Sequence, residues 1–144
     1  MLKGIPSILT PDLLKILMEM GHGDEIVIGD GNFPAAAYAK RLVRCDGHDV
    51  PTVLDAILGL FPLDAFVKEP VALMQTVARH TPEAPPIWAE YEKIIKKHEP
   101  ENNGIFYEER FAFYERAKKA YAIVATGESA LYANVILKKG VITP

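Results

Sequence analysis

Short apolar segments alternate with amphipathic ones along this 144-residue chain. EIVIGD at 25–30 is rich in β-branched residues and has glycines on both sides, which is typical of a strand buried on both faces. Similar segments occur at 71–77 and 122–126, and segments with helical periodicity separate them. The alternation predicts an α/β fold, in which a mostly parallel or mixed sheet has helices on both faces.

The first predicted helix has clear signals at both ends. Thr10 is a candidate N-cap, Pro11 fits the first helical position, and Asp12 suits the positive end of the helix dipole. Leucine and methionine then repeat at helical spacing as far as Met20, and Gly21 provides a stop.

The other elements follow from the same periodicities and from neighbouring prolines and glycines. The expected helices are 87–97, 109–121 and one within 52–63, which starts beside Pro51 and ends just before Pro62. The further expected strands are 42–45, after one helical turn, and 134–140. No repeat, linker or low-complexity segment interrupts this order, so residues 1–144 are expected to form a single domain.

Composition restricts the functional classes. Hydrophobic residues make up 49% and charged residues 24%, as in a globular protein with a full core. The formal net charge of −3, with scattered Lys and Arg, is unfavourable for nucleic-acid binding. The N-terminal apolar stretch is short and broken by two prolines, so neither a signal peptide nor a membrane span is expected, and we expect a cytoplasmic protein.

Signals for metal, cofactor or disulfide chemistry are weak. Cys45 is the only cysteine, so no intramolecular disulfide can form. The histidines lack metal-ligand spacing: His22, His48, His80 and His98. GDGNFP at 29–34 leaves the G-x-G-x-x-G pattern incomplete, and no P-loop, H-E-x-x-H or G-x-S-x-G motif occurs. A function without cofactor or metal is the expectation.

His22 and Asp30 stand before and after the same predicted strand. Asp30 lies at the carboxyl end, where open α/β sheets bind ligands, but a six-residue strand is roughly 20 Å long. Taken alone, each residue is explained as an ordinary turn residue. If the two share a site, either the His22 loop folds back or one of them acts across a subunit boundary.

The C-terminal half adds three polar candidates. Arg110 opens a predicted helix, and Tyr132 and Asn134 lie where a loop enters the last strand. Each also has an ordinary explanation, as a surface arginine or as part of a strand-start turn. Together with His22 and Asp30, they suit a polar, uncharged, hydroxyl-rich small molecule.

Three segments closely resemble the L-fucose mutarotase family, a branch of the ribose pyranase-like sugar mutarotases. They are LLKILMEMGHGDEIVIGDGNFPA, RFAFYERAKKAYAIVATGE and YANVILKKGV. The resemblance runs from MLKGIP to KKGVITP, and only 78–105 is unremarkable. It implies a cofactor-free isomerase that interconverts the α and β anomers of L-fucose.

The resemblance also implies roles for individual residues. It assigns the catalytic acid/base to His22 and sugar binding to five others: Asp30, Arg110, Tyr132, Ala133 and Asn134. Ribose pyranases usually have histidine where Arg110 stands, and relatives often have glycine at Ala133. Family members form ring-like homo-oligomers, often decamers, with sites where neighbouring subunits meet.

The chemistry fits these residue types. Ring opening needs one group to protonate the ring oxygen and another to take the proton of the anomeric hydroxyl. Imidazole exchanges protons at neutral pH, and positioned acid–base catalysis contributes on the order of 10²–10⁴-fold. A D-ribose pyranase, a non-catalytic sugar-binding protein and a purely structural oligomer are the alternatives.

Overall fold

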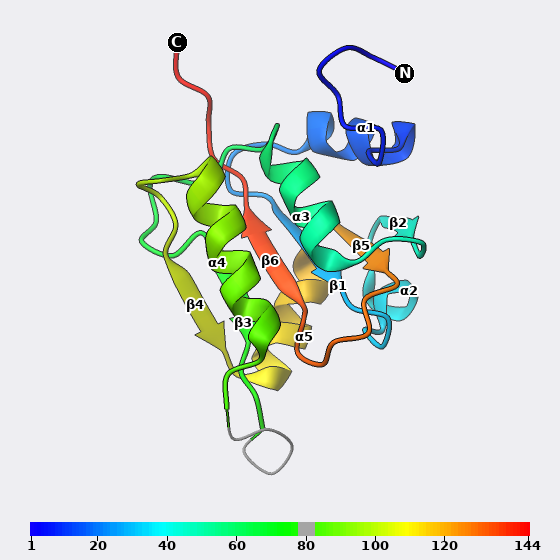
Figure 1. The fold of residues 1–144 in the computed structure, drawn as a ribbon, viewed down its shortest axis with the longest axis vertical. Coiled ribbons are helices and arrows are strands. Elements are labelled where there is room, and N and C mark those ends of the chain that lie inside the picture. The colour runs from blue at the N-terminus through cyan, green and yellow to red at the C-terminus, as the bar shows by residue number, and fades with distance from the viewer. Residues whose placement is uncertain (78–82) are drawn as a thin grey trace.

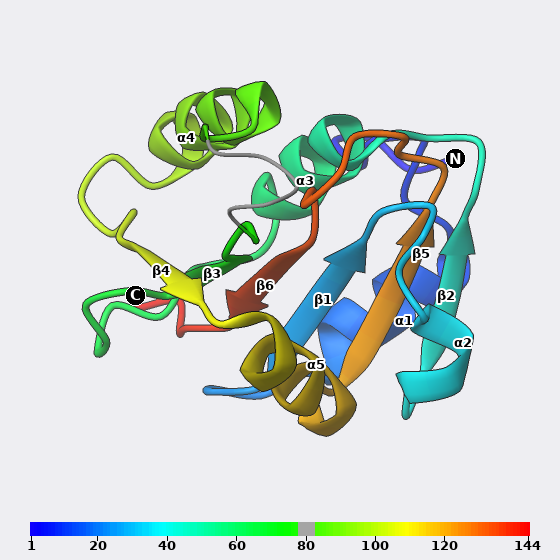
Figure 2. The same ribbon diagram turned by 90° about the horizontal axis from the view of Figure 1, so that it is seen from below.

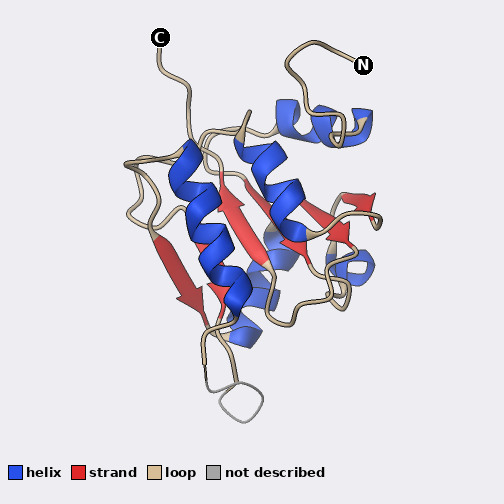
Figure 3. Ribbon diagram, viewed as in Figure 1, coloured by secondary structure: helices blue, strands red, loops and turns tan. Residues whose placement is uncertain are grey.

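The computed structural model describes residues 1–77 and 83–144, which form one six-stranded sheet with helices on both faces (Figures 1 and 3). The strands are β1 (Glu25–Gly29), β2 (Leu42–Cys45), β3 (Val71–Met74), β4 (Ile105–Glu108), β5 (Ala122–Thr126) and β6 (Val135–Lys138). The helices are α1 (Pro11–Glu19), α2 (Ala35–Tyr38), α3 (Val50–Leu58), α4 (Pro86–His98) and α5 (Arg110–Lys119). The predicted α/β fold with a mixed sheet is confirmed.

Within the described sheet, β6 is the one strand that runs against the others. The strand order is β2-β5-β1-β6-β3-β4, and β6 pairs antiparallel with both of its neighbours while the remaining pairs are parallel. The carboxyl ends of five strands therefore meet the start of β6 at one edge, which we call the Asp30 edge after the residue that follows β1. The opposite edge, where β1 begins and β6 ends, is the His22 edge.

The helices form two layers with separate cores. Buried side chains of α1, α3 and α4 pack with Ile26 and Ile28 of β1 on one face of the sheet. On the other face, Phe113 and Ala117 of α5 pack with Val27. Figure 2 shows α3 and α4 on one side of the sheet and α5 on the other. Because successive residues of β1 point to opposite layers, the strand is apolar and buried from Ile26 to Gly29, as its sequence predicts.

Capping side chains set where the helices begin. The Thr10 side chain accepts a hydrogen bond from the Leu13 N–H at 3.2 Å, and α1 starts at the next residue as predicted. The Asp49 side chain accepts from the Thr52 N–H at 2.8 Å, so α3 starts earlier than expected. The expected continuation of this helix to the residue before Pro62 is wrong, because Gly59 ends it.

Strand prediction was less complete than helix prediction. The expected strands at 71–77 and 134–140 shorten to β3 and β6. β4 has no counterpart among the predicted elements, because it lies at the border of the sheet and is partly exposed on both faces. Its four residues therefore show neither a continuous apolar run nor a clean alternation. No helix within 1–77 or 83–144 has the length and apolar character that a membrane crossing requires.

Candidate functional site

Asp30 lies in a turn that folds back over the end of β1. Its carboxylate accepts a hydrogen bond from the Asn32 N–H at 2.9 Å, and its carbonyl accepts one from the Phe33 N–H at 3.1 Å. β1 ends in Gly29, where a Cβ atom would lie only 2.9 Å from the Cβ atom of Phe33. The glycine thus allows the turn to close against the sheet and to hold Asp30 at its edge.

Asp30 and Asn134 lie side by side because β6 begins where β1 ends. The Asp30 N–H donates to Oδ1 of Asn134 at 2.8 Å, and both residues are buried. This bond leaves the side-chain NH₂ group of Asn134 as a donor. Burial raises the pKa of the Asp30 carboxyl, assisted by the charge of Glu128 and opposed by backbone N–H groups, chiefly those of Asn32 and Ala133.

Arg110 and Tyr132 complete the polar group. Arg110 is the first residue of α5, and its guanidinium carbon lies 5.8 Å from the centre of the Tyr114 ring. The Tyr114 hydroxyl is the main cause of the raised pKa of Arg110. Tyr132 has a φ of 56°, in the left-handed region, and its hydroxyl accepts a hydrogen bond from the Val77 N–H at 3.2 Å. Backbone conformations of this rare kind concentrate at ligand-binding sites.

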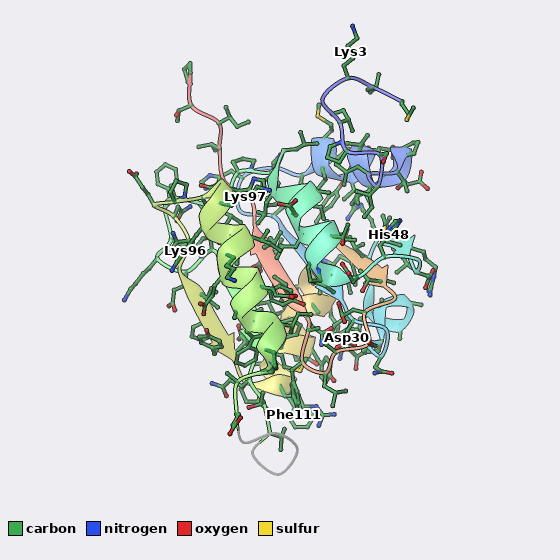
Figure 4. All side chains as sticks on the ribbon, in the orientation of Figure 1. Lys3, Asp30, His48, Lys96, Lys97 and Phe111 are labelled. Carbon is green, nitrogen blue, oxygen red and sulfur yellow. The ribbon has the colours of Figure 1, made fainter. Side chains whose placement is uncertain are left out.

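These residues line one pocket of about 160 Å³ at the Asp30 edge. Four predicted site residues contribute to it: Asp30, Arg110, Tyr132 and Asn134. Five others were missed by sequence reasoning: Asn32, Phe33, Met74, Tyr114 and Leu131. Figure 4 labels Asp30 in the half of the molecule opposite to the chain termini. A carboxylate, a guanidinium, an amide and a hydroxyl beside apolar side chains suit a small polyhydroxylated ligand.

Ala133 contributes to the pocket through its backbone. Its side chain is fully buried in the core and does not line the pocket wall. Its N–H group faces the Asp30 carboxylate and lowers the pKa of that group. Direct contact between a ligand and the Ala133 side chain is therefore not expected.

Two larger hollows lack this combination of groups. One of about 670 Å³ adjoins the pocket and has the carboxylates of Asp49 and Glu128 in its lining, but no arginine, lysine or amide side chain beside them among the described residues. The other, about 720 Å³, is a mainly apolar groove at the His22 edge. The small polar pocket is the better candidate for binding.

His22 lies at the opposite edge, in the turn between α1 and β1. The Gly23 N–H donates to the Lys139 carbonyl at 2.8 Å, which ties this turn to the end of β6. His22 Nε2 lies 3.1 Å from Oδ1 of Asp64, and its ring centre lies 5.3 Å from that of Phe66. The imidazole remains 46% exposed, whereas Asp64 is almost fully covered.

Asp64 is held as a carboxylate. Burial acts to raise its pKa, but the Phe66 N–H, the His22 ring and the charge of Lys138 outweigh burial and lower it. The Phe66 N–H donates a hydrogen bond, at 3.0 Å, to Oδ1 of Asp64, the same oxygen that faces His22. His22 is thus oriented by a fixed anionic acceptor.

The structure does not bring His22 to Asp30 within one chain. Asp30 bonds to the start of β6, and the His22 turn bonds to its end. At about 3.3 Å per residue, the five residues of β1 alone separate the edges by roughly 17 Å. The possibility that the His22 loop folds back is therefore wrong for the isolated chain.

Two missed residues differ in the signal that the sequence offered. Tyr114 follows Arg110 by four residues on the same helix, so helical spacing alone places both on one face. Asp64 has no comparable signal, because it is 42 residues from His22 and meets it only through tertiary packing.

Residues 1–77 and 83–144 contain no group of three or more His, Cys, Asp or Glu side chains placed to hold a metal ion. His80 lies outside the described residues.

Comparison with known proteins decides the family. Residues 3–142 match the model of the RbsD / FucU transport protein family. The chain belongs to the RbsD/FucU family. This finding confirms the resemblance seen in the sequence.

Within the RbsD/FucU family, the chain is similar to fucose mutarotases. Fucose mutarotase of Danio rerio is 51% identical over 148 residues, which cover 99% of this chain and 95% of that protein. The crystal structure of the fucose mutarotase from Streptococcus pneumoniae in complex with L-fucose is 54% identical, with a TM-score of 0.93. The match covers 99% of this chain and 100% of that one.

The ribose branch of the family is more distant. Bacillus subtilis RbsD complexed with D-ribose is 25% identical, with a TM-score of 0.72, over 99% of this chain and 100% of that one. This chain of the RbsD/FucU family thus has the same fold as both branches, and its sequence identity is higher to the fucose branch.

Proposed function

We propose that this protein is an L-fucose mutarotase, which interconverts the α and β anomers of the sugar by opening and closing its ring. The observation that carries the proposal is the Asp30-edge pocket, in a chain that is 54% identical along its whole length to a fucose mutarotase with bound L-fucose. The residue roles below, the assembly and a cytoplasmic location are part of the same proposal.

The pocket offers the groups that a monosaccharide needs. Asp30 accepts hydrogen bonds from sugar hydroxyls, and the Arg110 guanidinium and the NH₂ group of Asn134 donate them. Phe33 and Met74 supply apolar surface for the C–H face of the ring and for the methyl group that distinguishes a 6-deoxy sugar. Neutral substrates with many hydroxyls fit this balance better than anions do.

His22 carries the proton in the proposed mechanism. Asp64 accepts a hydrogen bond from Nε2–H, so the lone pair of the neutral imidazole lies on Nδ1. That nitrogen takes the proton of the anomeric hydroxyl as the C–O bond of the ring breaks, while the ring oxygen takes up a proton from solvent water. On closure, the hydroxyl oxygen attacks the aldehyde carbon and releases its proton to solvent, and the imidazolium returns its proton to the carbonyl oxygen. The open aldehyde can rotate before closure, which yields the other anomer.

A complete site requires two copies of the chain, because His22 and the pocket lie at opposite edges. We place His22 of one copy over the pocket of a neighbour in a ring-like homo-oligomer, with a decamer as the expected size. The apolar groove at the His22 edge supports this arrangement. It includes exposed apolar side chains of a kind that monomers rarely gather in one place: Leu2, Met18, Val141 and Ile142.

Saturation-transfer NMR on L-fucose tests the proposal. The protein should exchange the two anomers on the order of 10²–10⁴ times faster than buffer does, and His22→Ala should abolish the gain. His48→Ala is the matched control, because His48 (labelled in Figure 4) is an exposed histidine that does not line the pocket. An unchanged rate in His22→Ala would remove His22 from the mechanism.

The same experiment distinguishes the alternatives. A ribose pyranase would exchange the ring forms of D-ribose faster than the anomers of L-fucose. A non-catalytic sugar-binding protein would shift sugar or protein signals without faster exchange. A purely structural oligomer would do neither.

A further inference from the structure

Two side chains of α4 hold the segment 132–134, which is assigned to sugar binding in the proposed function, from the side opposite to the pocket. The indole N–H of Trp88 donates to the Tyr132 carbonyl at 2.9 Å, and the Tyr91 hydroxyl donates to the Ala133 carbonyl at 2.7 Å. Trp88 and Tyr91 are three residues apart, so they lie on one face of the helix. The carbonyls of two consecutive loop residues, Tyr132 and Ala133, are thus fixed by two side chains from consecutive turns of α4.

The hydrogen bond from Trp88 also determines where a donor points on the pocket side. The Tyr132 carbonyl and the Ala133 N–H belong to one planar trans peptide unit, so they point in opposite directions. With the carbonyl directed at Trp88, the N–H is directed at the Asp30 carboxylate, whose pKa it lowers. The orientation of α4 is therefore transmitted to Asp30 through one peptide plane.

The backbone at this position needs such support. Tyr132 has a φ of 56°, which residues other than glycine adopt rarely and keep only when their surroundings impose it. Tyr91 is fully buried, and burial strongly raises the pKa of its hydroxyl, so it remains a donor across the physiological range. Without that hydroxyl, the carbonyl of the buried Ala133 would have no described side-chain donor.

We propose that Trp88 and Tyr91 are positioning residues for the sugar site, which set the geometry of Asp30 and Asn134 without touching the sugar. The inference rests on the proposed function, because it assigns these residues to the pocket of that reaction.

Trp88 also provides a fluorescence signal with which this contact can be followed. Trp88 is the single tryptophan, and it contacts both the Tyr132 carbonyl and the Tyr107 ring, 5.2 Å away.

The test compares Tyr91→Phe with Tyr121→Phe in the full-length assembled protein. Tyr121 is the matched control, because its hydroxyl also donates one side-chain hydrogen bond, to Glu19 at 2.9 Å, but lies outside the pocket. Tyr91→Phe should raise the KM for L-fucose about tenfold and change kcat less than about threefold, because His22 is held by other elements. Tyr121→Phe should keep both values.

Tryptophan fluorescence supplies an independent readout. Titration with L-fucose should change the emission of Trp88 in the unaltered protein, with a midpoint that Tyr91→Phe moves about tenfold upward. If Tyr91→Phe does not fold, Trp88→Phe tests the same bond network, and it should raise KM in the same way. A loss of kcat at unchanged KM would indicate only a smaller folded fraction and would overturn the inference, as would values within twofold of the unaltered protein. Failure of the proposed function would be distinct, since the unaltered protein itself would then not accelerate exchange.

Discussion

The two edges of the sheet are built in contrasting ways. At the Asp30 edge, four segments distant in sequence meet around one pocket, and two of its residues, Asp30 and Asn134, are buried and bonded to each other. At the His22 edge, a half-exposed imidazole rests on one covered carboxylate beside an apolar groove. Under the proposed function, a single chain fixes the geometry of binding, whereas the proton carrier His22 depends on contact with another chain.

The largest expected effect comes from mixing two inactive variants. His22→Ala and Asp30→Asn should each reduce anomer exchange by about 10² or more. If each site takes its histidine and its pocket from different copies, co-assembly in equal amounts should restore about one quarter of the sites. Saturation-transfer NMR on the mixed sample measures the recovery.

Native mass spectrometry provides the control for this experiment, because it shows whether mixed oligomers have formed. Mixed oligomers without any recovery would mean that both residues act in sites of a single chain, and the contrast between the edges would lose its functional meaning.

A smaller loss is expected from Asp64→Asn. The variant keeps the shape of the side chain but removes the charge that orients His22, so kcat should fall about tenfold while KM stays within twofold. Asp46→Asn is the matched control, since Asp46 is an exposed carboxylate paired with Arg44. Steady-state exchange rates across fucose concentrations separate the two constants. A rise in KM instead would place Asp64 in the binding pocket and not beside the proton carrier.

Arg110→His changes the pocket at the Asp30 edge, and it should alter the selectivity between sugars more than the rate of anomer exchange. The resemblance to ribose pyranases, which usually have histidine here, predicts that the variant loses about tenfold in affinity for L-fucose and less for D-ribose. Calorimetric titration with both sugars measures the change, with Arg44→His as a surface control. Equal losses for the two sugars would show that Arg110 holds any monosaccharide without distinguishing between them.

The smallest effects concern stability, and they have opposite signs at the two edges. The pKa of Asp30 is raised, so its contribution to stability falls as the pH rises from the unfolded value of ~3.9 through the folded pKa. The pKa of Asp64 is lowered, so its contribution is present above ~3.9 and is lost as the pH falls through the folded pKa. At pH 7, Asp30→Asn should therefore stabilise the protein and Asp64→Asn should destabilise it by about 1 kcal/mol.

Urea unfolding at pH 7 and at pH 4, at one protein concentration, checks these signs. The difference for Asp30→Asn should be smaller at pH 4, because the raised pKa places its titration above that pH. The difference for Asp64→Asn should persist at pH 4 and should shrink only when the series is extended below about 3.9. Stabilisation by both substitutions would indicate that Asp64, like Asp30, is kept for function at a cost in stability.

Sequence reasoning was most successful where position follows from the end of an element. Asp30 follows an apolar strand and Asn134 precedes another, so the order of elements alone brings them to a sheet edge. The length of the predicted strand also showed that His22 and Asp30 could share a site only through a folded-back loop or across a subunit boundary, and it left both possibilities open.

Pairings made by tertiary packing could not be predicted in this way. Asp64 reaches His22 because the loop after α3 bonds to the end of β6, through the bridge between Leu63 and Lys139. The contact of α4 with the Tyr132 segment likewise joins residues about forty positions apart. β4 escaped prediction because a border strand carries only a weak apolar pattern.

The reversed direction of β6 has a practical consequence for work on this protein. It returns the chain to the His22 edge, where Leu2 and Ile142 line the same groove as His22, and both termini lie at one end of the molecule (Figure 1). An affinity tag fused to either end of this chain would therefore crowd the surface that meets a neighbour in the proposed assembly. A polyhistidine tag would also add foreign imidazoles beside the one whose proton transfer is to be measured. Kinetic work on His22 calls for protein from which the tag has been cleaved.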